Sequence, residues 1–252
     1  MEPTIVARRA LAAMDLTSLN ESDCVEDIRR LCASAHTPVG PVAAVCVYPE
    51  MVAVARAALA ESPVRVATVV NFADGGCDPA RVARECRRAL AAGAHEIDVV
   101  MPYAAWLAGD EAAARAVLTA AREACADQLL KVILETGVLQ REPVIRAAAR
   151  LAIDCGADFI KTSTGKVPIN ATLDAARWML DEIADSGRVC GFKAAGGIRS
   201  VADAAGYFAL ADARLGADWA SPARFRLGAS SLLADVLRVL GSAVPGAAGG
   251  GY

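Results

Sequence analysis

The sequence predicts an α/β protein built as a single (β/α)₈ TIM barrel. Short apolar runs with β character recur eight times between residues 14 and 228, and alanine-rich amphipathic segments separate them. The chain has 252 residues, a length typical of one such barrel. Polar residues also gather where several of these runs end, as expected for a fold whose site forms at the carboxyl ends of its strands.

The first half of the chain supplies four of the eight runs. A short arginine-bearing helix comes first, and the alternation that follows it is typical of a strand with polar side chains on one face. Asn20 is expected to cap a helix that runs through Leu31, and Pro49 to open another helix at a favoured position. A further helix is expected from about Asp78. The four runs are residues 14–19, 42–48, 64–70 and 95–100.

The second half supplies the other four runs, which are residues 129–135, the run that carries Lys161, residues 189–193 and residues 225–228. No break in composition indicates a second domain, so residues 1–241 are assigned to the barrel. Residues 242–252 are predicted to form a flexible glycine-rich tail. Residues 246–252 have almost no side chain to bury, so packing cannot offset the entropy cost of ordering them.

The composition limits the function classes. With 55% hydrophobic residues and a formal net charge of -3, the chain can bury a large core and lacks the basic charge of a nucleic-acid binder. No run of 18 apolar residues occurs, and the start of the sequence lacks a signal-peptide pattern. We therefore expect no membrane span and a cytoplasmic location.

Cysteine and histidine usage argues against a metal-dependent mechanism. The 8 cysteines form no Cys-x-x-Cys pair, and most lie in apolar patterns, where a reduced cysteine acts as a small hydrophobe. With His36 and His95 as the 2 histidines, a three-histidine zinc site is impossible. Carboxylates could still hold magnesium, but the expectation is a protein without a metal or another cofactor.

The placement of the lysines is informative. Of the 26 basic residues only four are lysines, and all four lie in or just after predicted β runs. Genomic composition explains why lysine is scarce, but it does not explain this placement. Arginine is effectively never deprotonated, so it cannot replace a lysine that acts as a nucleophile or exchanges a proton. The four are Lys131, Lys161, Lys166 and Lys193.

Lys161 has the surroundings of a nucleophilic amine. It ends a short apolar run and is followed by hydroxyl side chains, Gly165 and Lys166. Burial of its stem disfavours the charged ammonium, and a free amine can attack a carbonyl group. The hydroxyls and backbone N–H groups beside it could hold an anion, which favours a phosphorylated carbonyl compound. The alternative is a buried structural lysine beside a polar turn.

Two glycine-rich turns follow the last two β runs, at residues 191–199 and 228–233. Barrels commonly hold phosphate in the loops after strands 7 and 8, although paired glycines also occur in ordinary turns. Lys161, Lys193 and Glu135 fall at or near predicted strand ends, as does Gly228. Three further charged residues, Asp15, Asp98 and Lys131, lie deeper, where they could form a purely structural network.

Six motifs, which follow one another in order from about Asp15 to Leu233, together resemble those of the deoxyribose-phosphate aldolase family. The chain departs from this family at Ala194, where proline is frequent, and in the loop at residues 73–77. The motifs are residues 15–20, 46–49, 96–100, 159–166, 191–193 and 228–231.

The resemblance implies a metal-free class I aldolase of deoxyribonucleotide catabolism and carbohydrate degradation. Such a lyase reversibly splits 2-deoxy-D-ribose 5-phosphate into D-glyceraldehyde 3-phosphate and acetaldehyde. By the resemblance, Lys161 forms the Schiff base, and the charge of Lys193 would lower its pKa. Asp98 would exchange protons with Lys193 and an ordered water. The alternative for these last two residues is a structural ion pair.

The resemblance also implies the remaining site residues. Asp15, Thr17 and Lys131 would orient the reacting groups, and Cys46 would be a packing residue near the pocket. The tail itself, and not the resemblance, suggests a role for Tyr252, which is its one sizeable side chain: on a flexible tether it could reach over the barrel mouth and relay a proton to the enamine, and the alternative is a frayed terminus. The residues that would bind the substrate, mainly through its phosphate group, are Gly165, Lys166, Gly196, Gly197, Arg199, Gly228, Ser230 and Ser231.

Three other functions stay open at this point. A sibling aldolase or a transaldolase would use the same lysine chemistry on another phosphosugar. A pyridoxal-phosphate enzyme also combines a Schiff-base lysine with a phosphate site. A non-catalytic phosphosugar-binding barrel is the third, against which the joint presence of Lys161, Lys193 and Asp98 argues. The expected partners are a small phosphosugar and, as one option, a second copy of the chain, but neither nucleic acid nor membrane.

Overall fold

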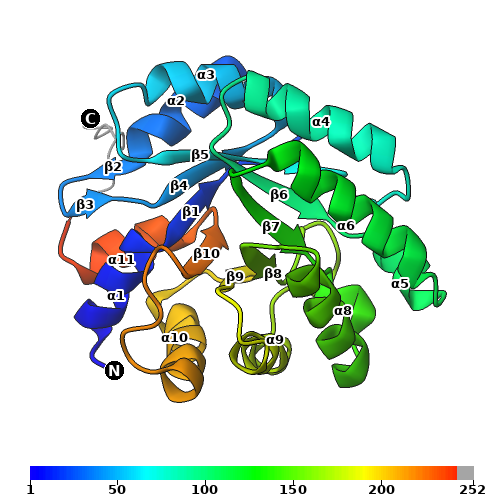
Figure 1. The fold of residues 1–252 in the computed structure, drawn as a ribbon. Coiled ribbons are helices and arrows are strands. Elements are labelled where there is room, and N and C mark those ends of the chain that lie inside the picture. The colour runs from blue at the N-terminus through cyan, green and yellow to red at the C-terminus, as the bar shows by residue number, and fades with distance from the viewer. Residues whose placement is uncertain (243–252) are drawn as a thin grey trace.

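Eight parallel strands close into a barrel in the computed structural model, which describes residues 1–242, and helices surround the barrel (Figure 1). Each strand pairs with the next one in the chain, and β1 closes the ring by pairing with β10. The predicted fold class is thus confirmed. The barrel strands are β1 (Met14–Thr17), β4 (Ala44–Val47), β5 (Arg65–Val70), β6 (Glu96–Val100), β7 (Leu129–Ile133), β8 (Phe159–Lys161), β9 (Gly191–Ala195) and β10 (Phe225–Ala229).

The helices pack their apolar faces on the outside of the barrel. In α4, for example, Val82, Cys86 and Ala89 recur at helical spacing and are buried, while the arginines between them face outward. The helices are α1 (Pro3–Ala12), α2 (Val25–Ser34), α3 (Val52–Ala58), α4 (Pro79–Ala91), α5 (Tyr103–Leu107), α6 (Glu111–Cys125), α7 (Thr136–Leu139), α8 (Glu142–Asp154), α9 (Leu173–Asp185), α10 (Val201–Leu215) and α11 (Leu232–Val239).

The strand register directs charged side chains into the barrel. Lys161 on β8 pairs with Lys193 on β9, and Lys193 pairs in turn with Arg226 on β10. On the other side of the barrel, Asp98 on β6 pairs with Lys131 on β7. Residues paired across neighbouring strands point to the same face of a sheet, and all five of these side chains are buried. Charged groups that are far apart in the sequence therefore meet inside the barrel.

The start of α2 differs from the sequence expectation. Asn20 does not cap this helix, because the helix begins at Val25 and its cap position is Cys24. The backbone N–H of Cys24 donates to the carboxylate of Asp27 at 2.9 Å. The side chain of Asn20 instead donates to Ser18 and Asp23, within the loop that follows β1. Asn20 is thus a loop residue at the barrel mouth.

A small hairpin of β2 (His36–Thr37) and β3 (Gly40–Pro41) was not predicted. Pro49 opens a 3₁₀ turn, η1 (Pro49–Met51), and α3 itself begins only at Val52. The helix α7 was not predicted either, and it begins directly after residues 129–135, which were expected to form a β run. It packs closely on the loop between β8 and α9, because Gly137 has no side chain. A Cβ atom on Gly137 would lie 1.7 Å from the carbonyl oxygen of Ile169. This contact holds α7 against the loop between β8 and α9.

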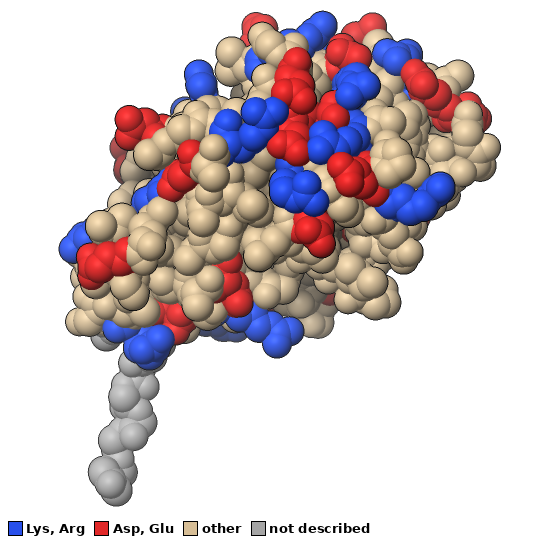
Figure 2. Space-filling view, turned by 90° about the horizontal axis from the view of Figure 1, so that it is seen from below, with Lys and Arg blue, Asp and Glu red and all other residues tan. Residues whose placement is uncertain are grey.

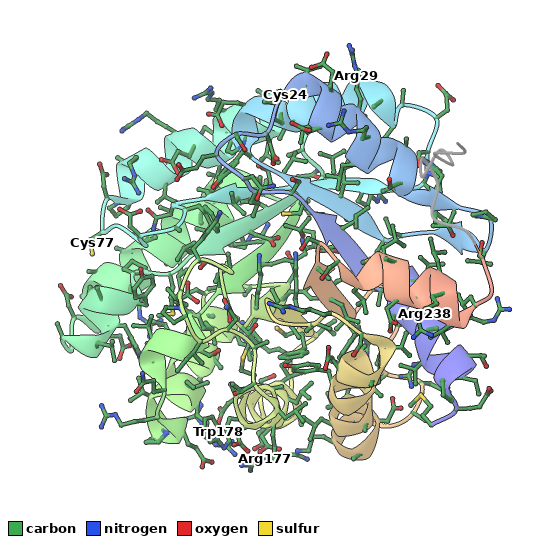
Figure 3. The ribbon with its side chains drawn as sticks, turned by 180° about the vertical axis from the view of Figure 1, so that it is seen from behind. Cys24, Arg29, Cys77, Arg177, Trp178 and Arg238 are labelled. Carbon is green, nitrogen blue, oxygen red and sulfur yellow. The ribbon has the colours of Figure 1, made fainter. Side chains whose placement is uncertain are left out.

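The cysteines are all free. Five of them are buried, whereas Cys24 and Cys77 are exposed and lie on peripheral loops (Figure 3). Burial raises the pKa of the Cys32 thiol to about 11 and that of the Cys190 thiol to about 12. Cys32 and Cys190 therefore stay neutral near pH 7, as expected for small hydrophobic residues.

The outer face formed by α8, α9 and α10 carries interspersed charges of both signs (Figure 2). Arg146 on α8 pairs with Asp181 on α9 at 2.7 Å, and Arg214 on α10 pairs with Asp185 at 2.6 Å. Among residues 1–242, no helix is both long enough and apolar enough to cross a membrane. Apart from Ser242, the predicted tail, including Tyr252, lies outside the described residues.

Candidate active site

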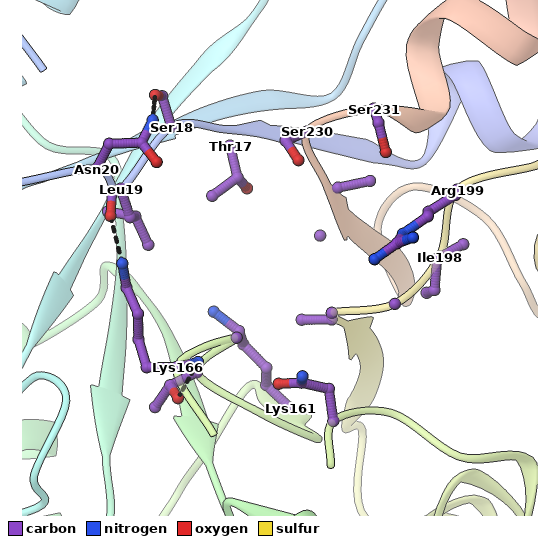
Figure 4. A pocket seen from close by; sticks show the side chains of 18 residues that line it. Thr17, Ser18, Leu19, Asn20, Lys161, Lys166, Ile198, Arg199, Ser230 and Ser231 are labelled. Carbon is purple, nitrogen blue, oxygen red and sulfur yellow. Dashed lines mark hydrogen bonds between the residues drawn. The ribbon is translucent and has the colours of Figure 1, made fainter. Parts of the chain in front are cut away.

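A cavity of about 430 Å³ opens at the carboxyl ends of β1, β8, β9 and β10 (Figure 4). This is the barrel end at which the sequence placed the site. Ten of the predicted site residues line the cavity, namely Thr17, Lys161, Gly165, Lys166, Gly196, Gly197, Arg199, Gly228, Ser230 and Ser231.

Lys161 reaches the cavity floor from the last position of β8. Its side chain points into the pocket, yet the residue is only 3% exposed. Its Nζ lies 2.9 Å from Oδ2 of Asp98. Burial lowers the pKa of Lys161, and the charge of Lys193 lowers it further, while Asp98 partly opposes both effects. The pocket therefore contains an amine with an increased neutral fraction, as a nucleophile requires.

Lys193 lies below the cavity, and its predicted position was wrong in one respect. The sequence placed it at or near a strand end, but it is the middle residue of β9, which continues to Ala195. Its Nζ lies 2.8 Å from Asp98 and 2.5 Å from Asp15. Burial alone would lower the pKa of Lys193, but Asp15 and Asp98 outweigh this effect and raise it well above its usual value. Lys193 is therefore an ammonium beside Lys161.

Asp98 connects the lysines. Its Oδ2 accepts from both Lys161 and Lys193, and its Oδ1 accepts from Lys131 at 2.7 Å. Burial alone would raise the pKa of Asp98, but Lys131, Lys161 and Lys193 together hold it well below its usual value. Oδ2 of the ionised Asp98 thus lies within hydrogen-bond distance of the Lys161 amine and of the Lys193 ammonium. A proton can pass between them through Asp98.

The charged network continues below these groups with two residues that the sequence reasoning did not select. Arg226 donates to Asp15 at 2.7 Å and to Glu96 at 3.0 Å, and Lys131 donates to Glu96 at 2.6 Å. The sequence did contain an indication that Glu96 and Arg226 belong to this network. Glu96 stands two positions before Asp98, so both side chains share one face of β6. Arg226 likewise interrupts an apolar run.

Glu135 anchors the loop that carries Lys166. It follows β7 in a left-handed backbone conformation with φ of 57°. Its carboxylate accepts from the hydroxyl and the backbone N–H of Thr164, and the Thr164 hydroxyl accepts from the backbone N–H of Lys166 at 3.0 Å. Burial raises the pKa of Glu135, although the hydrogen bonds from Thr164 oppose this shift. The sequence indicated that this residue lies at a strand end, but not that it contacts the loop.

The other side of the cavity has the groups of an anion site. Gly196 and Gly197 follow β9 with φ of 86° and 83°. Ser230 and Ser231 precede the first turn of α11, where unpaired backbone N–H groups and the helix dipole favour an anion. The side chain of Arg199 lies beside the same cavity (Figure 4). A phosphate group would thus meet backbone donors, hydroxyls and a guanidinium.

Lys166 lines the same cavity but has a protein partner. Its Nζ donates to the backbone carbonyl of Leu19 at 2.6 Å, along one side of the pocket (Figure 4). Leu19 belongs to the loop after β1, so this bond joins two loops that are far apart in the sequence. Lys166 therefore closes one side of the cavity and has further ammonium protons for a ligand.

The accessory residues have distinct surroundings. Thr17 lines the cavity and donates to the backbone oxygen of Asp15 at 2.8 Å. Cys46 is buried in a small apolar cluster with Leu19, Ala67 and Val69. Burial raises the pKa of the Cys46 thiol, although Lys193 opposes the shift. Cys46 is therefore a neutral packing group beside the pocket.

Other lining residues were not predicted. Asn170 packs against Gly196 so closely that a Cβ on this glycine would lie 2.7 Å from the asparagine side chain. No motif marks Asn170 in the sequence, since it lies in an irregular loop. The remaining unpredicted lining residues are Ser18, Leu19, Asn20, Thr164, Ala195, Ile198 and Ala229.

Comparison with known proteins gives one family match. A model described as DeoC/LacD family aldolase matches residues 9–238. This range contains every predicted site residue except Tyr252. It also contains all eight strands of the barrel.

Solved structures with the same fold include proteins of related description. One from Coccidioides immitis, described as a "putative deoxyribose-phosphate aldolase", is 32% identical, with 93% of this chain and 87% of that chain covered at a TM-score of 0.82. One from Toxoplasma gondii ME49, with the same description, is 25% identical over 94% of each chain at a TM-score of 0.85. A deoxyribose phosphate aldolase from Aeropyrum pernix, described as having a unique tetrameric structure, is 24% identical over 96% of this chain and 93% of that one, with a TM-score of 0.74. At this last identity the likeness concerns the fold alone.

Proposed function

The chain belongs to the DeoC/LacD family of aldolases, and from this premise we propose that it is a deoxyribose-phosphate aldolase acting through a Schiff base on Lys161. The observation that carries the proposal is the position of this amine. Lys161 lies at the floor of a cavity and shares Oδ2 of Asp98 with the Lys193 ammonium. Glycine-rich loops and a helix N-terminus lie on the other side of the same cavity.

The reaction begins when the neutral Lys161 amine adds to C1 of the open-chain aldehyde. The carbinolamine loses water to give an iminium ion, whose positive nitrogen accepts the electrons of the breaking C2–C3 bond. A base removes the proton from the C3 hydroxyl as this bond breaks. D-Glyceraldehyde 3-phosphate leaves and an enamine remains on Lys161. Protonation of the enamine at C2 and hydrolysis then release acetaldehyde and the free amine.

Asp98 and Lys193 supply the proton transfers in this scheme. Their shared oxygen and ammonium lie within 2.8 Å of each other and next to Lys161. Such a pair can deliver a proton to the carbinolamine hydroxyl as it leaves and recover one later. Because the ammonium also repels a positive charge on Lys161, it favours the amine before substrate binds.

The phosphate would bind where the backbone donors, Ser230, Ser231 and Arg199 converge. This arrangement holds the substrate by the end that does not react, so C1 is directed to the cavity floor. Lys166, which closes one side of the cavity, would add a further positive charge near the ligand.

Borohydride trapping tests the proposal. Reduction in the presence of acetaldehyde or 2-deoxy-D-ribose 5-phosphate should convert the imine on Lys161 to a stable secondary amine, which peptide mass spectrometry can locate. Lys166 lines the same cavity and is the internal control, since it should stay unmodified. Lys161→Arg should fold normally and lose essentially all turnover, because arginine has no usable lone pair. An adduct on Lys166 or Lys193 would overturn the assignment.

A comparison of aldol donors separates this reaction from that of sibling aldolases. With D-glyceraldehyde 3-phosphate as acceptor, acetaldehyde should be consumed and dihydroxyacetone should not. Preference for dihydroxyacetone would keep the lysine chemistry and assign the chain to another phosphosugar. An absorbance band near the visible range in the purified protein would indicate a pyridoxal-phosphate enzyme instead.

A further inference from the structure

The barrel interior contains six charged groups besides Lys161, which we call the barrel cluster. Three are carboxylates and three are cations, and every one of them is buried. Hydrogen bonds join them into one network that begins at Lys161 and ends at the amino ends of β6 and β10. The barrel cluster consists of Asp15, Glu96, Asp98, Lys131, Lys193 and Arg226.

Glu96 and Arg226 form the end of the barrel cluster that is remote from the cavity. Glu96 is the first residue of β6, and neither side chain lines the pocket. Two nitrogens of Arg226 lie 3.2 and 3.0 Å from the two oxygens of Glu96. A third nitrogen donates to the backbone carbonyl of Pro222 at 2.6 Å. Glu96 and Arg226 therefore do not contact a substrate bound in the cavity.

The charges of the barrel cluster cancel when all six groups are ionised. Burial opposes ionisation, but the partners of Asp15, Glu96 and Asp98 hold the pKa of each carboxylate below its usual value. The carboxylates likewise overcome burial and raise the pKa of Lys131, Lys193 and Arg226. Lys161 is the exception among these buried cations. A proton on it would leave one uncompensated positive charge, which is costly inside a protein.

Two other titratable groups face Lys161. Cys46 approaches from β4, and its buried thiol is neutral near pH 7 because burial raises its pKa. Glu135 approaches from the end of β7 and bonds to Thr164, outside the barrel cluster. Both groups are the same in every variant considered below, so their effect on Lys161 cancels in the comparison.

We propose that Glu96 and Arg226 are positioning residues for the lysine chemistry, which complete the charge balance of the barrel cluster so that Lys161 is left as an uncharged amine. The inference rests on the proposed function, since it assigns to Lys161 the role of nucleophile. The two residues act through Lys131, Asp15 and Lys193, which lie between them and the reacting centre.

The proposal predicts opposite effects for the two members of the pair. Arg226→Met removes a positive charge, so a proton on Lys161 restores neutrality and the pKa of Lys161 should rise. Glu96→Gln removes a negative charge at nearly constant volume, so the pKa of Lys161 should fall. Because other charges lie in between, we expect each shift to be about half a unit, which is less than that caused by a direct neighbour. The double variant should return close to the wild-type value.

The experiment measures the pH dependence of the rate at which acetaldehyde and cyanoborohydride modify Lys161, followed by intact and peptide mass spectrometry. This readout reports the free amine and does not require turnover. Arg226→Lys keeps the charge and should keep the wild-type pH dependence even if it folds less stably. Glu182→Gln is the matched control, because it removes a buried carboxylate from the arginine pairs between α8 and α9. It should change stability without moving the pH dependence.

The outcomes separate the two proposals. If wild-type Lys161 is not trapped at any pH, the proposed function fails. Trapping on Lys161 with shifts of the same sign, or with no shift, in Glu96→Gln and Arg226→Met would overturn only the charge-balance inference. If Arg226→Met does not fold, the pH dependence of Lys161 modification in Glu96→Gln and in the double variant, compared with the wild type, still tests the inference. Failure of all three variants to fold would assign the pair a structural role and would also overturn it.

Discussion

Lys193 shows how a charged residue can set the protonation of its neighbour. It is the register partner of Lys161 on the neighbouring strand, and the side-chain nitrogens of both lysines approach Oδ2 of Asp98. Its own pKa is raised because Asp15 and Asp98 outweigh burial, so it stays charged when Lys161 is neutral. Two lysines in similar burial thus differ in charge because their carboxylate partners differ in number.

This difference leads to a prediction for Lys193→Leu. Removal of the neighbouring positive charge should raise the pKa of Lys161 by about one unit or more, so the acidic limb of the pH–rate profile should move to higher pH. Turnover at pH 7 should fall by about a hundredfold or more, because a proton-transfer partner is also lost. Steady-state rates between pH 5 and pH 10 would measure both effects. An unmoved acidic limb would mean that the two lysines are not electrostatically coupled.

At the scale of single residues, the sequence indicated which side chains gather at the candidate site better than it indicated where along their strands they lie. Lys161 and Asp98 could be selected because a lysine and an aspartate within apolar β runs are unusual. Lys193 was misplaced because the apolar pattern does not mark where β9 ends. Glu96 and Arg226 were missed because a charge near the edge of a run resembles an ordinary strand terminus, and only the closed barrel brings the two together.

The elements around the cavity are positioned by contacts between the loops of different βα units. The loop after β8 is held on one side by Glu135 and α7, and on the other by the bond from Lys166 to Leu19. Gly137 permits the first contact, since any side chain there would meet Ile169. The strands were predictable from their apolar runs. The start of α2 and the existence of α7 were not, because both depend on side-chain bonds and close approaches rather than on periodicity.

Glu135→Ala tests the importance of this loop. The substitution leaves the Thr164 donors without their acceptor, which should lower the free energy of unfolding by about 1–3 kcal/mol. The Michaelis constant should rise more than the turnover number falls, because the loop carries Lys166 but Lys161 keeps Asp98. Urea denaturation and steady-state kinetics would measure these changes. Glu142→Ala is the matched control, since that carboxylate pairs with Arg146 on α8 away from the cavity and its loss should leave the Michaelis constant unchanged. A larger fall in the turnover number than in affinity would contradict this role.

At the scale of the whole molecule, the centre of the barrel contains a network of buried charged residues, where an apolar core would have been sufficient to stabilise the fold. The closed ring of strands and the outer helices followed from the count of apolar runs and the chain length. The network did not, because its members come from β1, β6, β7, β9 and β10 and meet only when the ring closes. Tyr252 stays a prediction, since it lies outside the described residues.

The barrel cluster also predicts how stability depends on pH. Asp15 and Asp98 have a folded-state pKa well below their unfolded value of about 4, because the cations around them outweigh burial. A carboxylate of this kind binds fewer protons in the folded state than in the unfolded state as the pH falls below about 4. It therefore stabilises the fold fully above that pH, and the contribution is lost progressively as the pH approaches the depressed folded-state value.

Urea denaturation at pH 7, 5, 4 and 3 would measure this loss. The free energy of unfolding should change little between pH 7 and pH 5, where the carboxylates are ionised in both states, and should fall steeply below pH 4. Surface ion pairs contribute little to such a slope because solvent screens them. Asp15→Asn should therefore flatten the acid limb while lowering stability at pH 7, where Lys193 and Arg226 lose a shared partner. An acid limb as steep in Asp15→Asn as in the wild type would mean that acid unfolding is controlled by carboxylates outside the barrel.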